Sequence, residues 1–166
     1  MVPRIALVLV ALGLSACGSS GAATQYFQSS AGYRLSYPAG WNARSTSSGA
    51  FSASAADGRE YLTVMRVVGS PGQVLAAHRS ELSRVSDHVM SREVQVPSGS
   101  VSELWSSRVE TDGQVGIYQQ YFLAAGGGTL WVQHGCVEHG PEFANESADR
   151  DCDDAGAAIV RSVDLT

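Results

Sequence analysis

The sequence predicts an α+β fold in which an antiparallel β-sheet is flanked by helices. Segments with apolar residues at every second position dominate the chain, Asp-Gly pairs separate several of them, and two segments have helical spacing. The 166 residues, 44% of them apolar, suffice for one domain with a single core. Strands that follow one another with few helices between them are typical of an antiparallel sheet.

Short alternating segments before residue 69 predict two pairs of strands. Ala31-Gly32 and Asp57-Gly58 mark the turns, and an Asp-Gly pair is a strong signal for a two-residue hairpin turn. In the last segment, Leu62 and Val64 face away from Tyr61, so both faces of that strand are expected to be covered. The predicted strands are residues 25–29, 33–37, 51–55 and 61–68.

A long helix is predicted next. Ser70 is suited to the N-cap position and Pro71 to the first helical position. Apolar residues then recur at helical spacing, which predicts a helix over residues 70–90 that packs on one face of the sheet. The residues of this stripe are Val74, Leu75, His78, Leu82, Val85 and Val89.

Strands resume after this helix and lead to a final one. Asp112-Gly113 and the glycines at 126–128 mark turns. The third of these strands carries apolar residues on one face, interrupted only by Gln119. The predicted strands are residues 92–96, 101–110, 114–124 and 129–136, and the predicted final helix is residues 152–161.

The first 16 residues predict a lipoprotein signal peptide. Arg4 precedes ten apolar residues, which is too short for a bilayer-spanning helix of about 20 residues. The following Leu14-Ser15-Ala16-Cys17 resembles the lipobox of bacterial lipoproteins, in which the cysteine thiolate accepts the lipid. We expect Cys17 to be lipidated, residues 17–24 to form a flexible tether and residues 25–166 to form one extracytoplasmic domain.

The other two cysteines predict a disulfide. Once Cys17 is assigned to the lipid, Cys136 and Cys152 remain as a pair in an oxidising compartment. Their bond would stabilise the fold by about 3 kcal/mol in the chain-entropy model. The alternative is a nucleophilic Cys136 with His139 as its base, but no oxyanion or third-group motif accompanies that spacing. We therefore favour the disulfide.

The mature sequence resembles the PsbP-like family, named for an extrinsic subunit of photosystem II. The resemblance rests on residues 32–41 (GYRLSYPAGW), on the helix predicted after a long strand and on the closing residues 159–165 (IVRSVDL). It implies an α/β/α sandwich around an antiparallel sheet. Members are mostly accessory or protein-binding modules and not enzymes, and the family offers no shared catalytic residues to carry over. Pro38 and Trp41 are interpreted as fold markers that end a strand and fill the edge of the core.

Charge and composition exclude several functions. The net charge is −5, so a nucleic-acid partner is not expected. All 11 basic residues are arginines, which excludes a P-loop lysine and a Schiff-base lysine. Seven acidic residues gather near the C-terminus and form a possible surface for a basic partner, or simply a solvated loop. These residues are Glu138, Glu142, Glu146, Asp149, Asp151, Asp153 and Asp154.

No metal site or cofactor is predicted. The alternating aspartates at 149–153 resemble half of a calcium loop, but Asp154 and Val160 stand where that loop needs glycine and glutamate. We favour the interpretation that these carboxylates stand at the start of the final helix, where the helix dipole stabilises negative charge. The histidines, His78, His134 and His139 among them, lack the spacing of a zinc motif.

Five aromatic residues of the later strands are either core or a binding platform: Trp105, Tyr118, Tyr121, Phe122 and Trp131.

The function most consistent with the sequence is a lipid-anchored accessory module of the cell envelope that binds a partner protein without catalysis. One alternative is a small apolar ligand or lipid held between the sheet and the helix that begins at Ser70. A hydrolase is a further alternative, and it would need a polar cleft that joins His134 or His139 to a serine or a free thiol.

Overall fold

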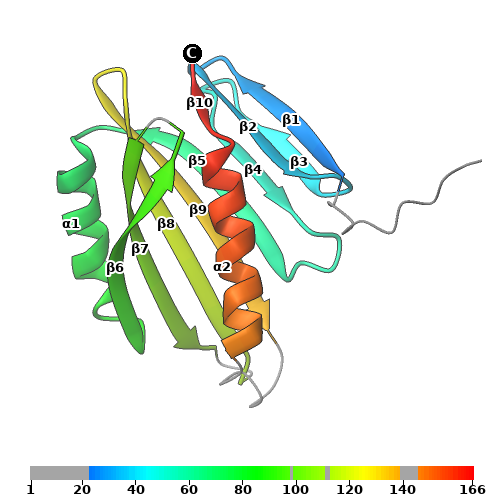
Figure 1. Cartoon of the computed structure of the whole chain (residues 1–166), viewed down its shortest axis with the longest axis vertical. Helices are drawn as coiled ribbons and strands as arrows, with labels where there is room; N and C mark the ends of the chain where they lie inside the picture. The colour runs from blue at the N-terminus through cyan, green and yellow to red at the C-terminus, as the bar shows by residue number, and fades with distance from the viewer. Residues whose placement is uncertain (1–22, 98, 111–112, 139–145) are drawn as a thin grey trace, which may run out of the picture.

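The computed structural model describes residues 23–97, 99–110, 113–138 and 146–166, without the side chains of Glu138 and residues 146–150. The predicted signal peptide, Cys17, His139 and Glu142 lie outside the described residues. The described chain forms two antiparallel sheets and two helices (Figure 1).

The larger sheet has seven strands in the order β3-β4-β5-β9-β8-β7-β6. Neighbouring strands along the chain mostly pair as hairpins, whereas β5 pairs with β9 and joins the first half of the sheet to the second. The strands are β3 (Asn42–Ser45), β4 (Phe51–Ser54), β5 (Glu60–Val67), β6 (His88–Val96), β7 (Gly99–Val109), β8 (Val115–Ala125) and β9 (Gly128–Glu138).

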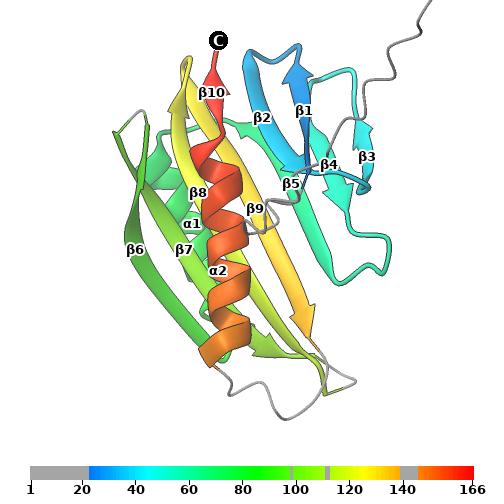
Figure 2. The ribbon, with the colours of Figure 1, turned by 45° about the vertical axis from the view of Figure 1, so that its right-hand side comes forward.

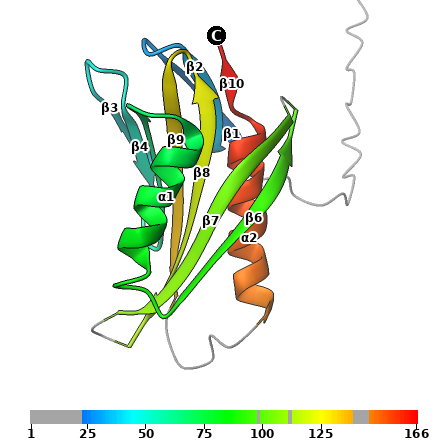
Figure 3. The same ribbon diagram turned by 90° about the vertical axis from the view of Figure 1, so that its left-hand side faces the viewer.

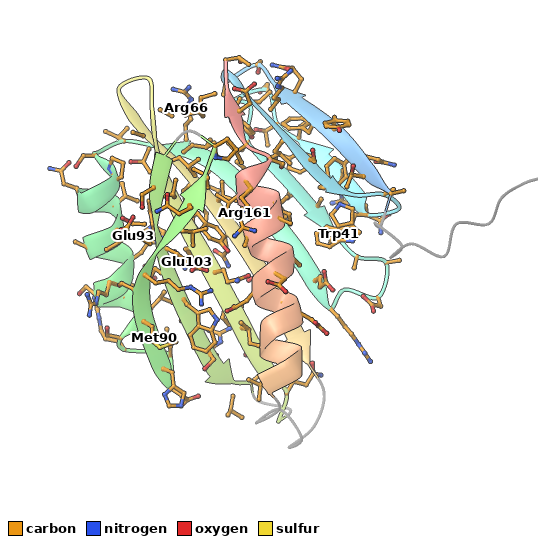
Figure 4. The ribbon with its side chains drawn as sticks, viewed as in Figure 1. Trp41, Arg66, Met90, Glu93, Glu103 and Arg161 are labelled. Atoms are coloured by element: carbon orange, nitrogen blue, oxygen red, sulfur yellow. A yellow bond between two sulfur atoms is a disulfide. The ribbon has the colours of Figure 1, made fainter. Side chains whose placement is uncertain are left out.

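A smaller sheet brings together the two ends of the domain. Its order is β1-β2-β10, so the last strand of the chain pairs with the second. Pro38 is the last residue of β2, as expected, and Trp41 packs against the edge of the main core (Figure 4). The strands are β1 (Thr24–Ser29), β2 (Tyr33–Pro38) and β10 (Asp164–Leu165).

The two helices, α1 (Pro71–Leu82) and α2 (Glu146–Arg161), lie on opposite faces of the large sheet. Gln119 and Gln120 are neighbours on β8, so their side chains point to opposite faces. Gln119 contacts Asp153 of α2, and Gln120 contacts His78 of α1. Figure 3 shows the sheet edge-on between the helices. Among the described residues, one helix covers each face, so the layers of an α/β/α sandwich are present in a sparse form.

The two faces are covered to different extents. On the α2 face, α2 and the small sheet lie side by side over the large sheet, and together they enclose the main core (Figure 2). On the other face, α1 buries Val74 against Leu104 and Phe122. The main core includes Tyr33, Leu35, Tyr37, Phe51, Leu62, Val64, Tyr121, Leu123, Leu130, Val132, Ile159 and Val160. The α2 face is therefore closed, and the α1 face is open beside the helix.

The structure corrects the predicted length of α1. The helix begins at the expected place, where the Gln73 side chain accepts a hydrogen bond from the Ser70 backbone N–H at 3.0 Å. It ends at Leu82, and residues 88–96 pair with β7 as strand β6 instead of continuing the helix. The Val85 side chain, predicted to lie on the packed stripe, is 55% exposed. Sheet pairing of nine residues outweighs the weak helical periodicity there.

Candidate functional site

An open cleft lies on the α1 face, between the C-terminal half of α1 and the exposed surface of the large sheet. Its volume is about 340 Å³. Strands β5, β7, β8 and β9 form its floor, and the helix and the turn after it form one wall. We call it the α1 cleft, and it is lined by Tyr61, His78, Glu81, Leu82, Val85, Ser86, Arg108, Tyr118, Gln120, Trp131 and Gln133.

Two tyrosines lie across the floor of the α1 cleft because a glycine separates them. Gly135 of β9 pairs with Tyr61 of β5 on one side and with Tyr118 of β8 on the other. A Cβ atom at Gly135 would lie 2.4 Å from the Tyr61 ring, and one at Gly116 would lie 2.3 Å from the Tyr118 hydroxyl. Glycine inside a strand allows this close approach, so the two rings rest on the sheet with their centroids 6.4 Å apart.

Amide side chains hold the aromatic wall of the α1 cleft in place. The Gln133 amide donates a hydrogen bond to the Tyr61 hydroxyl at 2.7 Å. The Trp131 indole N–H donates to the Gln120 Oε1 at 3.1 Å, which fixes that oxygen as an acceptor. His78 Nδ1 lies 2.6 Å from the same oxygen and therefore carries the proton.

A charged cluster borders the Tyr118 end of the α1 cleft. Arg108 Nε donates to Glu110 Oε1 at 2.7 Å, and the Tyr118 hydroxyl donates to the same carboxylate. The Arg108 guanidinium lies 5.2 Å from the Tyr118 ring centroid. Burial and the bond to Glu110 raise the pKa of Tyr118 to about 12, and the bonds from Tyr118 and Arg108 lower the pKa of Glu110. At neutral pH the phenol keeps its proton and the carboxylate is charged.

The opposite face carries a chain of polar groups that is closed off by α2. We call Arg92, Glu103, Asp153, Gln119 and His134 the α2 polar network. Arg92 bonds to the fully buried Glu103 and to Asp153 Oδ2, the latter at 2.8 Å (Glu103 is labelled in Figure 4). Asp153 Oδ1 accepts from the Gln119 amide at 3.0 Å, and Gln119 Oε1 lies 2.8 Å from His134 Nδ1. The network crosses from β6 to β9 beneath the helix.

Burial shapes the charges of this network. His134 is fully buried, and the loss of hydration lowers its pKa to about 4, so its imidazole is neutral at pH 7. The hydrogen bond to Glu103 raises the pKa of Arg92. In the sequence, Gln119 interrupts the apolar face of β8. It can stay buried on that face because His134 and Asp153 satisfy the hydrogen bonds of its amide.

The predicted disulfide is present. Cys136 of β9 and Cys152 of α2 are joined, with their Cα atoms 6.2 Å apart. The bond fixes the N-terminal half of α2 to the sheet beside His134. It also removes Cys136 as a nucleophile, which was the alternative interpretation of this cysteine.

The acidic stretch divides into inward and outward groups. Asp151 and Asp154 are exposed, whereas Asp153 faces the sheet and bonds to Trp105, Gln119 and Arg92. Asp153 thus helps to hold α2 on the sheet, with its side chain 26% exposed, and its part in a partner surface stays a prediction. Of the remaining acids, Glu138 lies in β9 and Glu146 and Asp149 lie in α2, with no described side chains.

The aromatic residues are divided in the same way. Trp105 and Tyr121 are buried on the α2 face, and Phe122 is buried under α1. Tyr118 and Trp131 line the α1 cleft. Four other residues of the α1 cleft are not predicted from the sequence: Tyr61, Arg108, Gln120 and Gln133. The signal that could have revealed the floor is Gly135, a glycine inside a predicted strand.

Comparison with known proteins identifies the fold. Over 92% of this chain and 99% of the other, the structure is similar to cyanobacterial PsbP (CyanoP) from Synechocystis sp. PCC 6803, with a TM-score of 0.56 and 13% identity. A protein of Bacteroides thetaiotaomicron VPI-5482 has a TM-score of 0.51 and 11% identity over 85% of this chain and 48% of the other. LpqN, described as involved in cell envelope biogenesis of Mycobacterium tuberculosis, has a TM-score of 0.49 and 15% identity over 89% and 87% of the two chains.

The chain therefore has the PsbP-like fold, as the resemblance in residues 32–41 predicts. No family model and no curated protein match the sequence. In the described part of the chain, neither helix is long and apolar enough to cross a membrane.

Proposed function

We infer that this chain is a lipid-anchored accessory protein of the cell envelope that binds a partner protein, without catalysis, in the α1 cleft. The observation that carries this proposal is the set of half-buried aromatic side chains, Tyr61, Tyr118 and Trp131, on an open surface. Such rings provide a large apolar area and a polar tip, and they are enriched among the residues that dominate binding at protein interfaces.

The lining of the α1 cleft favours a polypeptide over an apolar ligand or lipid. Glu81, Arg108, Gln120 and Gln133 contribute charges and amides to the cleft, which is open to solvent. An apolar ligand would remove water from these groups and return no hydrogen bonds, which is unfavourable. A protein segment offers backbone N–H and C=O groups together with apolar side chains, and can satisfy both kinds of surface.

Little supports the hydrolase alternative. His134 is fully buried beneath α2, and the neighbouring Cys136 is oxidised. A general base must reach the proton that it removes in a bound substrate, and a substrate cannot approach His134 while α2 is in place.

Photocrosslinking tests the proposed binding surface. The full chain, expressed in its native envelope, would carry p-benzoylphenylalanine at position 85 on the rim of the α1 cleft. A matched protein would carry it at position 154 on the exposed side of α2. We expect one discrete protein adduct, identified by mass spectrometry, from position 85 and none of that identity from position 154.

Two further substitutions separate specific binding from chance contact. Trp131→Ala removes an aromatic wall, and Glu81→Arg reverses a charge on the exposed surface of α1 without disturbing the core. Each should reduce the adduct from position 85 several-fold. An adduct that is equal at the two positions, or insensitive to both substitutions, would contradict the proposal. A lipid adduct in place of a protein would favour the apolar-ligand alternative.

The anchor has its own test. Full-length protein from cells fed with an alkyne-labelled fatty acid should carry the label, and Cys17→Ser should abolish it and release the protein from the membrane fraction. Unlabelled wild-type protein would refute the lipid anchor and leave the cleft proposal to its own experiment.

A further inference from the structure

Three potential metal ligands meet at the corner where α2 is fixed to β9. A ring nitrogen of His134 and the Sγ atoms of Cys136 and Cys152 all lie within 4.8 Å of one another, and all three residues are buried. His134 and Cys136 are two residues apart on β9, so their side chains share a face. His134 Nε2 is 3.9 Å from Cys136 Sγ. The disulfide holds both sulfur atoms in an oxidised form that cannot act as thiolate ligands.

The hydrogen bonds around His134 orient its free nitrogen toward the sulfur atom of Cys136. Asp153 can only accept, so Gln119 presents its amide N–H₂ to Asp153 and its oxygen to His134. His134 Nδ1 therefore carries the proton, and the lone pair of Nε2 faces Cys136. Metal-binding histidines typically donate their second N–H to a fixed acceptor in this way. Trp105 and Arg92 fix Asp153 in turn.

We propose that reduction of the disulfide between Cys136 and Cys152 converts this corner into a Zn²⁺ site with His134, Cys136 and Cys152 as ligands. An external dithiol would transfer two electrons and two protons to the disulfide, leaving two thiols and becoming a disulfide itself. Zn²⁺ then displaces one proton from each thiol and binds two thiolates and one imidazole. Two sulfurs and one nitrogen suit this borderline-soft ion, and water occupies the fourth position.

The geometry permits the change with a small movement. Two thiolates bound to one tetrahedral zinc lie about 3.8 Å apart, given Zn–S distances of about 2.3 Å. Once the disulfide is reduced, the two sulfur atoms are no longer bonded to each other, and rotation of their side chains can bring them to this separation. Glu60 lies opposite Cys136 in the strand pairing, 4.0 Å from His134 Nε2, and its side chain is 44% exposed. The partly exposed Glu60 side chain lies beside this corner, so we expect water and a small ion, unlike a substrate, to enter from this side.

Cobalt(II) provides the spectroscopic test. The full chain, purified in detergent, is reduced with a phosphine under nitrogen, desalted and titrated with Co²⁺ and then with Zn²⁺. We expect one equivalent of Co²⁺ to bind with thiolate charge-transfer absorption and the visible bands of tetrahedral coordination, and Zn²⁺ to displace it. The oxidised chain should give neither signal.

Variants assign the ligands. His134→Ala should weaken Zn²⁺ binding by at least about tenfold. The matched control His78→Ala removes a histidine on the opposite face and should leave the affinity unchanged. Circular dichroism follows the fold throughout, and recovery of any structure lost on reduction when Zn²⁺ is added would also support the proposal. Three results would overturn the proposal: the reduced chain binds no metal, the His134→Ala variant binds Zn²⁺ as tightly as the wild-type chain, or the reduced chain stays unfolded when Zn²⁺ is added.

Discussion

The two faces of the large sheet carry similar side chains in different surroundings. Arg92 on the α2 face and Arg108 on the α1 face are 42% and 41% exposed, and each pairs with a glutamate. The partner of Arg92, Glu103, is fully buried, whereas the Glu110 side chain is 27% exposed. The α2 face uses its polar groups to hold layers together, while the α1 face leaves polar and aromatic groups at a solvent-filled cleft. Coverage, more than residue type, distinguishes the polar groups that hold the layers together from those that line the open cleft.

The two arginines provide the sharpest test of this contrast. Arg92→Met would leave the charge of Glu103 buried without its partner and should lower the free energy of unfolding by about 3 kcal/mol, the low end for buried pairs, because Arg92 is partly exposed. Arg108→Met should cost less than about 1 kcal/mol. Urea denaturation measures both. Adding Glu103→Gln to Arg92→Met should recover at least half of the loss, and equal effects of the two single variants would erase the contrast.

Protonation of His134 should weaken the closed face as pH falls. Its pKa is lowered to about 4 in the folded protein, from about 6.5 when unfolded, so the unfolded chain binds the proton more readily. This contribution to stability is fully present above pH 6.5 and is lost as the pH falls toward 4. Between pH 7.5 and 5, about 2 kcal/mol should disappear.

Thermal and urea unfolding at several pH values would show this loss. His134→Gln should flatten that part of the profile, although it lowers stability at pH 7.5. An unchanged slope in this variant would mean that another group titrates.

A Gly→Ala substitution in each helix should change the stability of the fold in opposite directions. A Cβ at Gly156 of α2 would lie 2.2 Å from Gln119 Oε1, which is held by His134. Gly156→Ala should therefore destabilise the fold by about 1–2 kcal/mol despite the better helix propensity of alanine. Gly72→Ala in α1 meets nothing within 4 Å and should stabilise by up to about 1 kcal/mol. Denaturation midpoints that move in the same direction would count against tight packing of α2.

The smallest expected effect is on the open face. Tyr61→Phe removes the hydroxyl that accepts from Gln133, and the unfolding free energy should change by less than about 1 kcal/mol because water can replace the bond. The adduct formed by the photoreactive group at position 85 should nevertheless fall. A large loss of stability would show that the tyrosine serves the fold and not the cleft.

Much of the fold could be predicted from local patterns, and the site could not. Apolar residues at every second position, together with Asp-Gly turns, predict most strands to within a few residues. The disulfide is predicted because only two cysteines remain once Cys17 is assigned to the lipid. Strand β3 could not be predicted because its four residues are exposed and do not alternate between apolar and polar. The start of β6 is mistaken for helix because Val85 and Val89 continue the apolar spacing of α1. The α1 cleft depends on which strands become neighbours. Tyr61 and Tyr118 are brought together by β9, a pairing over long sequence separations that local periodicity does not encode.

The position of β1 would have a mechanical consequence if Cys17 carries the proposed lipid anchor. Among the described residues, β1 is an edge strand whose only strand partner is β2, with its first residue, Thr24, at the open end of the hairpin opposite Pro38. Phe27 of β1 also stacks on Phe51 of β4. A force applied at Thr24 would load the β1–β2 hydrogen bonds one after another before it reached the stacked pair Phe27 and Phe51 at the large sheet. With such an anchor, the six residues of β1 would detach first and lengthen the connection between the bilayer and the rest of the domain.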